Sequence, residues 1–255
     1  MTEKTGSGGA LAGIAVAAAT LLTIGFNWLA AAGMIGGVTP AEISAKYPTA
    51  VTPAGYAFSI WSLIYLGLIA YSVYQLSSNA GEKARSIRWL YVATCLLNCG
   101  WIYFWHHDYI AVCLGLIAGL AFTLFLINSR LRTVESTKDF WLVKAPFGLY
   151  FGWVTAATLV NLAILVASRN VETGTLFAVG LIVVAGTFGI LFRVALQNYI
   201  YPLAIAWAVT AIAVKQSGQT AIVATAAFVV IACLIATLSF VVNLPSTDHP
   251  RDEAK

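Results

Sequence analysis

The sequence predicts an all-α fold, a polytopic transmembrane bundle of about eight helices. Composition is the first reason, because 60% of the residues are hydrophobic and only 9% are charged, whereas soluble domains carry roughly 25% charged residues. The second reason is that the charges gather between long apolar runs, each close to the roughly 20 residues that a helix needs to cross the hydrocarbon core. The third is that these runs lack the alternating pattern of transmembrane barrel strands.

Each of eight apolar runs predicts one span. They are rich in Leu, Ala, Ile and Gly, which suits helices that pack in lipid. The first run is too long for a secretory signal, and its flank holds Lys4 beside Glu3, so we expect it to remain as an anchor. The runs are residues 10–34, 55–77, 87–105, 110–128, 142–167, 175–195, 199–215 and 220–242.

Two connections between the runs are longer than the others. Residues 33–54 form a polar outer loop that contains Pro40, Pro48 and Pro53. This loop either folds over the mouth of a pocket or is a plain connector, and the sequence leaves both interpretations open. Residues 129–140 form a charged connector on the opposite side.

The Lys and Arg residues are divided unequally between the two sides of the membrane. With eight spans and a cytoplasmic N-terminus, only Lys46, Arg169 and Lys215 lie outside, and the remaining 11 of the 14 lie in the cytoplasm. Such a bias indicates the cytoplasmic side. We therefore expect a multi-pass protein of the plasma (inner) membrane with both termini cytoplasmic. The net charge of +4 then reflects topology, and no basic patch with interleaved aromatics predicts a nucleic-acid partner.

Three runs carry stripes of aromatic and polar residues at steps of three and four, which place each stripe on one helix face. In lipid such faces turn toward neighbouring helices. Aromatic faces with a few amides at similar depth suit a flat apolar ligand with polar edges, and hydrogen bonding between helices is the alternative role of the asparagines. The stripes are Phe58, Trp61, Tyr65 and Leu68; Tyr91, Thr94, Asn98, Trp101 and Trp105; and Pro146, Tyr150, Trp153, Ala157 and Asn161.

Trp28 and Trp105 lie near span ends, where we expect them to belong to the interfacial aromatic belt. His106 and His107 follow the third run, and they form either a polar turn or a site for proton transfer or for a metal or haem iron. The pairs Gly115 and Gly119, and Gly148 and Gly152, permit close helix contact within one subunit or between two. A homodimer is therefore one alternative.

Nothing in the sequence indicates catalysis. The runs contain no paired carboxylates, no nucleophile beside a base and no phosphate-binding loop. Cys95 and Cys99 share a helix face, but no His or carboxylate joins them at ligand spacing, so we expect apolar packing and no metal. The prediction is a protein that is not an enzyme.

Three motifs resemble the TspO/MBR family, whose members are also called translocator proteins or tryptophan-rich sensory proteins. Residues 52–65, Thr-Pro-Ala-Gly-Tyr-Ala-Phe-Ser-Ile-Trp-Ser-Leu-Ile-Tyr, resemble the signature of its second helix. Residues 97–101, Leu-Asn-Cys-Gly-Trp, are similar to Leu-Asn-x-x-Trp on its third helix. Tyr150-x-x-Trp153, followed by Ala157 and Asn161, resembles the pattern of its fifth helix. The resemblance covers residues 10–167.

The resemblance implies a five-helix bundle whose pocket reversibly binds a tetrapyrrole such as protoporphyrin or haem, with sterol-like ligands in animal members. The sequence departs from the family at Asn27-Trp28-Leu29, where the family has Trp-Tyr followed by Lys-Pro, and at Pro146, which lies three residues early. The family's ligand-binding residues correspond to Trp61, Asn98 and Trp153, followed by Tyr65, Trp101 and Tyr150.

We therefore expect a membrane protein with a sensory or translocating role, whose partners are membrane lipid and an apolar small molecule. The alternative is a small-molecule transporter that binds no tetrapyrrole, and a purely structural subunit is a third interpretation. A transporter would favour broken helices and ionisable groups at the midplane. The expected parts are a TspO/MBR-like five-helix bundle over residues 1–170, three additional helices over residues 171–245 and a polar cytoplasmic tail over residues 246–255.

Overall fold

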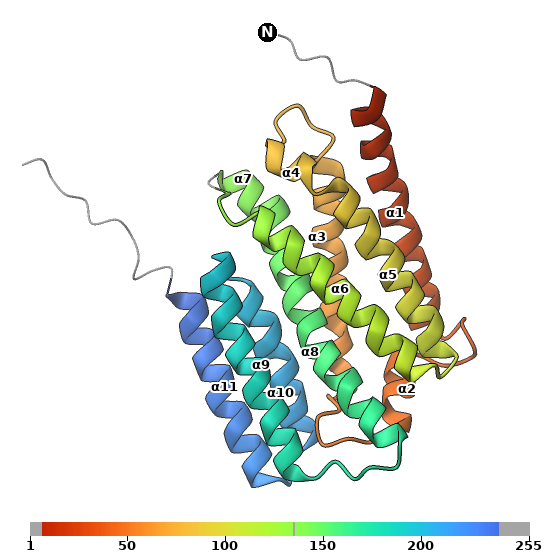
Figure 1. Ribbon diagram of the computed structural model, residues 1–255, viewed down its shortest axis with the longest axis vertical. Helices are drawn as coiled ribbons and strands as arrows, with labels where there is room; N and C mark the ends of the chain where they lie inside the picture. The colour runs from red at the N-terminus through yellow and green to blue at the C-terminus, as the bar shows by residue number, and fades with distance from the viewer. Residues whose placement is uncertain (1–6, 135, 240–255) are drawn as a thin grey trace, which may run out of the picture.

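The computed structural model describes residues 7–134 and 136–239, and eight long helices run side by side in it (Figure 1). None of the described residues belongs to a strand, so the predicted all-α bundle is confirmed. The predicted tail, residues 246–255, lies outside the described residues. The long helices are α1 (Ser7–Ala31), α3 (Ile60–Tyr74), α5 (Arg88–His106), α6 (Ile110–Arg130), α8 (Ala145–Ser168), α9 (Thr175–Leu196), α10 (Tyr201–Lys215) and α11 (Thr220–Leu238).

Six of the described helices are long and apolar enough to cross a membrane by length and composition alone. The count of about eight spans is therefore approximate: α10 is apolar but has only 15 residues, and α5, which carries Arg88 and Asn98, is not among the six. Both nevertheless lie within the bundle (Figure 1). The six candidate spans are Gly9–Ala31, Gly55–Tyr74, Ile110–Arg130, Thr137–Ser168, Thr175–Leu196 and Thr220–Leu238.

Five short elements connect the long helices. The most informative is α2 in the outer loop, because a complete capping box starts it: Thr39 and Glu42 each accept a hydrogen bond from the other's backbone N–H, and Pro40 occupies the first turn. The short elements are α2 (Pro40–Lys46), the 3₁₀ helix η1 (Gly55–Ser59), α4 (Glu82–Ser86), α7 (Thr137–Asp139) and the π-helical segment η2 (Phe140–Lys144).

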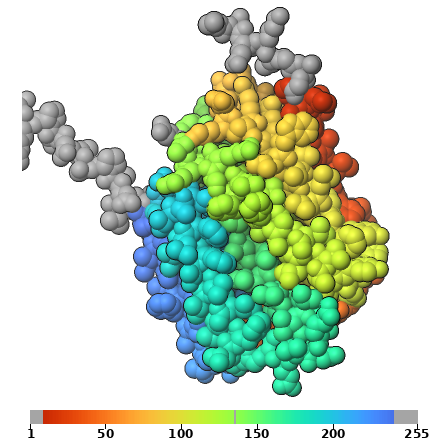
Figure 2. All heavy atoms as spheres, viewed as in Figure 1, coloured from red at the N-terminus to blue at the C-terminus, as the bar shows by residue number. Residues whose placement is uncertain are grey.

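The helices form two groups that meet at α8. In the first group α1 packs on α5, α5 on α6, and both α6 and α3 on α8. In the second group α10 packs against α9 and α11, and it also packs against α8. A helix that is apolar on all sides is typical of a buried position, and most residues of α8 are indeed buried. In the space-filling view only part of α8 is visible between the side chains of α6 and α9 (Figure 2).

Gly148 and Gly152 make the contact between α8 and α10 possible. A Cβ at Gly152 would collide with the carbonyl of Tyr201, and one at Gly148 would collide with the side chain of Asn198. That side chain bridges the two groups, since its Nδ2 donates to the carbonyl of Lys144 at 2.8 Å and also to Asn128. Gly148 and Gly152 therefore allow close contact between helices of one subunit, which is one of the two roles that the sequence left open for this pair.

Candidate functional site

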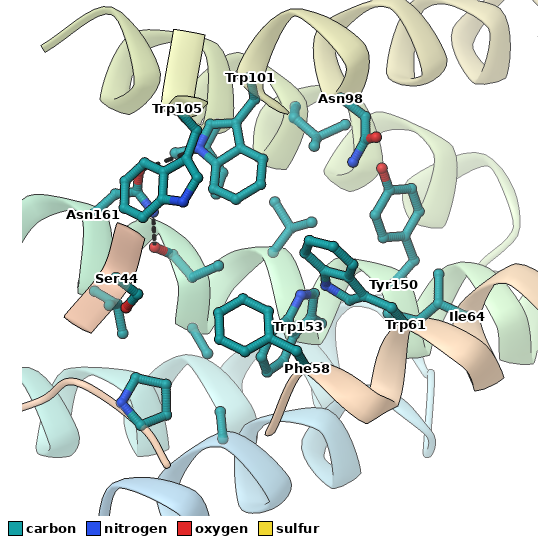
Figure 3. Close-up of a pocket in the computed structure, with 18 of the residues that line it drawn as sticks. Ser44, Phe58, Trp61, Ile64, Asn98, Trp101, Trp105, Tyr150, Trp153 and Asn161 are labelled. Atoms are coloured by element: carbon teal, nitrogen blue, oxygen red, sulfur yellow. Dashed lines mark hydrogen bonds between the residues drawn. The ribbon is translucent and has the colours of Figure 1, made fainter. Parts of the chain in front are cut away.

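A pocket lies beside the outer loop, between the first helix group and α10, with an empty volume of about 780 Å³ that includes the part open to solvent. The three striped helices α3, α5 and α8 contribute most of its lining, and α6 and α10 complete it. The stripes therefore converge, as their spacing predicts. All six predicted site residues line this pocket: Trp61, Tyr65, Asn98, Trp101, Tyr150 and Trp153. Figure 3 labels all of them except Tyr65.

Aromatic rings from three helices and η1 surround the pocket and touch one another (Figure 3). Phe58 packs edge-on against Trp61 and against Trp153, with ring centroids 5.4 and 6.0 Å apart. Trp61 also meets Trp101 edge-on, and Trp101 stacks on Trp105 with an interplanar angle of 22°. Edge-to-face and stacked arrangements are the favourable geometries for such rings. The rings hold each other in place and present a large apolar surface to the cavity.

Two amides are among the polar groups that line the pocket. The Oδ1 of Asn98 accepts a hydrogen bond of 2.6 Å from the Nδ2 of Asn27 on α1. The Oδ1 of Asn161 accepts one of 3.2 Å from the Nε1 of Trp101, and its Nδ2 donates to the carbonyl of Ala157. Both asparagines therefore join helices, and both also face the pocket. In Figure 3 the Tyr150 hydroxyl points toward Asn98, which places another polar group on that side.

The outer loop covers one side of the pocket. Ser44 of α2 and Pro53 line the cavity, so residues 33–54 are part of the site and not a plain connector. Trp105 of α5 anchors the first residue of α2, because its Nε1 donates a hydrogen bond to the carbonyl of Pro40 at 3.2 Å. At the other end of α2, Lys46 pairs with Asp108 at 3.1 Å, and because both side chains are well exposed this ion pair adds little stability.

The capping box of α2 fixes the charge at the start of this cover. The Glu42 carboxylate accepts hydrogen bonds from the backbone N–H and the hydroxyl of Thr39, at 2.7 and 2.9 Å. These bonds favour the ionised form and lower the pKa of Glu42 from its ordinary value of 4.5. At neutral pH the cap is therefore intact.

No pattern in the sequence indicated that α10 belongs to this site. Ala208 and Ile212 of α10 line the pocket, yet small apolar residues in an apolar helix carry no pattern that sets them apart. Three hydrogen bonds tie α10 and its C-cap residue Gln216 to residues 49–57, which lead into the pocket. One of them, between Trp207 and Ala57, lies directly beside Phe58. The bonds run from Ala54 N to Ala211 O (3.0 Å), from Trp207 Nε1 to Ala57 O (2.9 Å) and from Gln216 Nε2 to Thr49 O (3.3 Å).

The belt assignment of Trp105 was wrong. Its side chain is 2% exposed and lines the pocket, because α2 folds back over the end of α5 and removes it from the interface. Trp28 is 61% exposed, as a belt residue would be.

The two histidines bond to their own helix. The Nδ1 atoms of His106 and His107 lie 2.8 and 2.7 Å from the carbonyls of Ile102 and Tyr103. Within the described ranges no cluster of three His, Cys, Asp or Glu side chains could hold a metal ion. The polar-turn interpretation therefore fits these residues best.

A family model described as TSPO-like protein matches residues 13–240. The match extends beyond the motifs of α3, α5 and α8 and includes α9, α10 and α11. No curated protein and no solved structure matches the chain.

Proposed function

The chain belongs to the TSPO-like protein family, and from that premise we propose that it binds a planar, largely apolar ligand of the tetrapyrrole type, such as protoporphyrin or haem, reversibly in the pocket beneath α2. The proposed role is sensory or translocating, not catalytic. The observation that carries the proposal is the ring of aromatic side chains from η1, α3, α5 and α8 around one cavity.

The chemistry of the lining supports a flat apolar ligand. Trp61 and Trp153 both contact Phe58 and offer ring surface for stacking. Asn98 lines the same cavity and can hydrogen-bond to a polar edge of the ligand. Such a combination of apolar walls and a few polar groups is typical of small-molecule sites.

A transporter that binds no tetrapyrrole is the second candidate function. Transport coupled to protons or ions commonly uses ionisable residues near the midplane. Among the described residues that line the pocket, none is Asp, Glu, Lys, Arg or His. This lining counts against ion-coupled transport, and it suits the apolar ring of a tetrapyrrole.

Titration of the purified full-length protein with protoporphyrin, followed by absorbance and tryptophan quenching, tests the proposal. We expect saturable binding that weakens about tenfold or more in Trp61→Ala and in Trp153→Ala, because each loses ring contact and buried apolar area. Trp61→Phe should lose less, since it keeps a ring.

Trp89→Ala is the matched control, because Trp89 lies on α5 but is 60% exposed and outside the pocket. Trp207 is unsuitable as a control, since it bonds to Ala57 beside the pocket. Unchanged affinity in both pocket variants, or an equal loss in Trp89→Ala, would place the ligand elsewhere. No saturable binding by the parent protein would refute the tetrapyrrole proposal and leave the transporter as the better candidate.

A further inference from the structure

A second cavity lies directly behind one wall of the pocket, between α8, α9 and α10. Its empty volume is about 280 Å³, which includes the part open to solvent, and every residue that lines it is Val, Ala, Leu or Ile. The two cavities share four lining residues, two from α8 and two from α10. The shared residues are Ala156, Val160, Ala208 and Ile212.

The shared wall is thin where the helices are closest. Ala156 and Ala208 contribute only a methyl group each, and both are buried. One turn earlier on α8, Gly152 lets the backbone of α10 approach at Tyr201, which brings the two helices together. Of the four shared residues, only Val160 and Ile212 have side chains that extend beyond Cβ and can change rotamer. A ligand that reached from one cavity into the other would have to displace these two side chains.

An apolar void of this kind suits an apolar occupant. Water needs two to four polar partners in a buried site, and the described lining offers no polar side chain. An unfilled space in a packed interior also costs stability. A group that filled the space would regain the lost contacts between the second helix group and α8.

We propose that this cavity is a subsite for an alkyl or isoprenoid chain carried by the ligand of the main pocket. The inference rests on the proposed function, because the flat part of the ligand must occupy the aromatic pocket. The chain then extends between Ala156 and Ala208 toward Ala185 of α9. A ligand class follows from this geometry: a planar, tetrapyrrole-like ring system with one apolar tail.

Two esters of one chlorin, methyl and hexyl pheophorbide a, test the subsite because they share the ring system and differ only in the chain. With the full-length protein in detergent, we expect the hexyl ester to bind about fivefold or more tightly, since burial of each added methylene favours binding. Ala185→Leu should abolish this difference and leave the methyl ester's affinity unchanged, because Ala185 lines only the second cavity. Leu181→Ala, which enlarges the cavity, should increase the difference.

Ala195→Leu is the control, since Ala195 lies on the same helix but is exposed. It makes the same substitution and corrects for partition of the hexyl ester into detergent. Equal affinity for the two esters in the parent protein, or a difference that survives Ala185→Leu, would overturn the subsite and leave the space to a membrane acyl chain or to loose packing. Failure of both esters to bind would instead count against the proposed function.

Discussion

Asn27 and Asn98 are the residues that connect the rim of the pocket to α1. Each is more than nine-tenths buried, and one hydrogen bond of 2.6 Å joins them. A buried amide without a hydrogen-bond partner lowers stability, so this bond offsets part of the cost of burying both side chains. It also fixes the side chain of Asn98, whose amide lines the pocket.

A double-mutant cycle on this pair measures that contribution. We expect Asn27→Ala and Asn98→Ala to lower stability individually, with a coupling energy of about 0.6 kcal/mol and at most about 1.7 kcal/mol, the range for hydrogen bonds between transmembrane helices. Thermal unfolding in one detergent gives the four values. Additive effects would mean that the bond is not formed in the membrane protein.

At the level of elements, the helices and the pocket-lining faces were predicted correctly where the residues combine helical spacing with a distinctive side-chain type. The eight apolar runs correspond to the eight long helices, and the stripes of α3, α5 and α8 meet at one pocket. The role of α10 was missed because Ala208 and Ile212 look like any residues of an apolar helix. The cover α2 was missed as a helix, although Thr39 and Glu42 have the spacing of a capping box.

The contact between α8 and α10 gives a prediction about Gly152, with Gly115 in the interior of α6 as the comparison. Gly152→Ala should destabilise the protein by about 1–3 kcal/mol, because its Cβ would enter the space of Tyr201 and Ala204. Gly115→Ala meets no neighbour within 4 Å, and should be neutral or stabilise by up to about 1 kcal/mol through helix propensity. Thermal unfolding of both variants checks this, and equal effects would contradict the packing described.

The cover gives a second prediction at this scale. Thr39→Ala removes the side chain that accepts from the N–H of Glu42, and loss of such a cap costs about 1 kcal/mol. In a Ser44→Cys background, where residue 44 lies on the buried face of α2, alkylation should become about fivefold faster. Thr210→Ala on the exposed side of α10 should leave the rate unchanged. An equal rate in Thr39→Ala would show that α2 opens by another route.

The whole molecule has two ends with different charge. At the upper end of Figure 1 lie α4 with Lys83 and Arg85, and the end of α6 with Arg130. At the lower end lie α2 and the connection between α8 and α9. Among the described residues, the positive charges that we predicted to be cytoplasmic thus gather at one end of the bundle. Orientation stays a prediction.

Cysteine labelling in intact cells tests that orientation. Ser217→Cys, in the turn between α10 and α11, should react with an impermeant maleimide added outside. Ser78→Cys, in the turn between α3 and α4, should react only after the cells are opened. Both positions are exposed, so accessibility within the protein does not decide the result. Reversed labelling would invert the topology, and labelling of both from outside would rule out a fixed even-span arrangement.

The wall that α10 contributes has a consequence for the order of events during synthesis. The ribosome makes the chain from its N-terminus, and domains generally fold in that order, so α1 to α8 can assemble before residues 201–215 have emerged. Until then the aromatic cavity lacks Ala208 and Ile212, and residues 49–57 lack the three bonds that hold them. The cavity is thus completed late in synthesis, and a chain released early would possess the aromatic rings without the wall that encloses them.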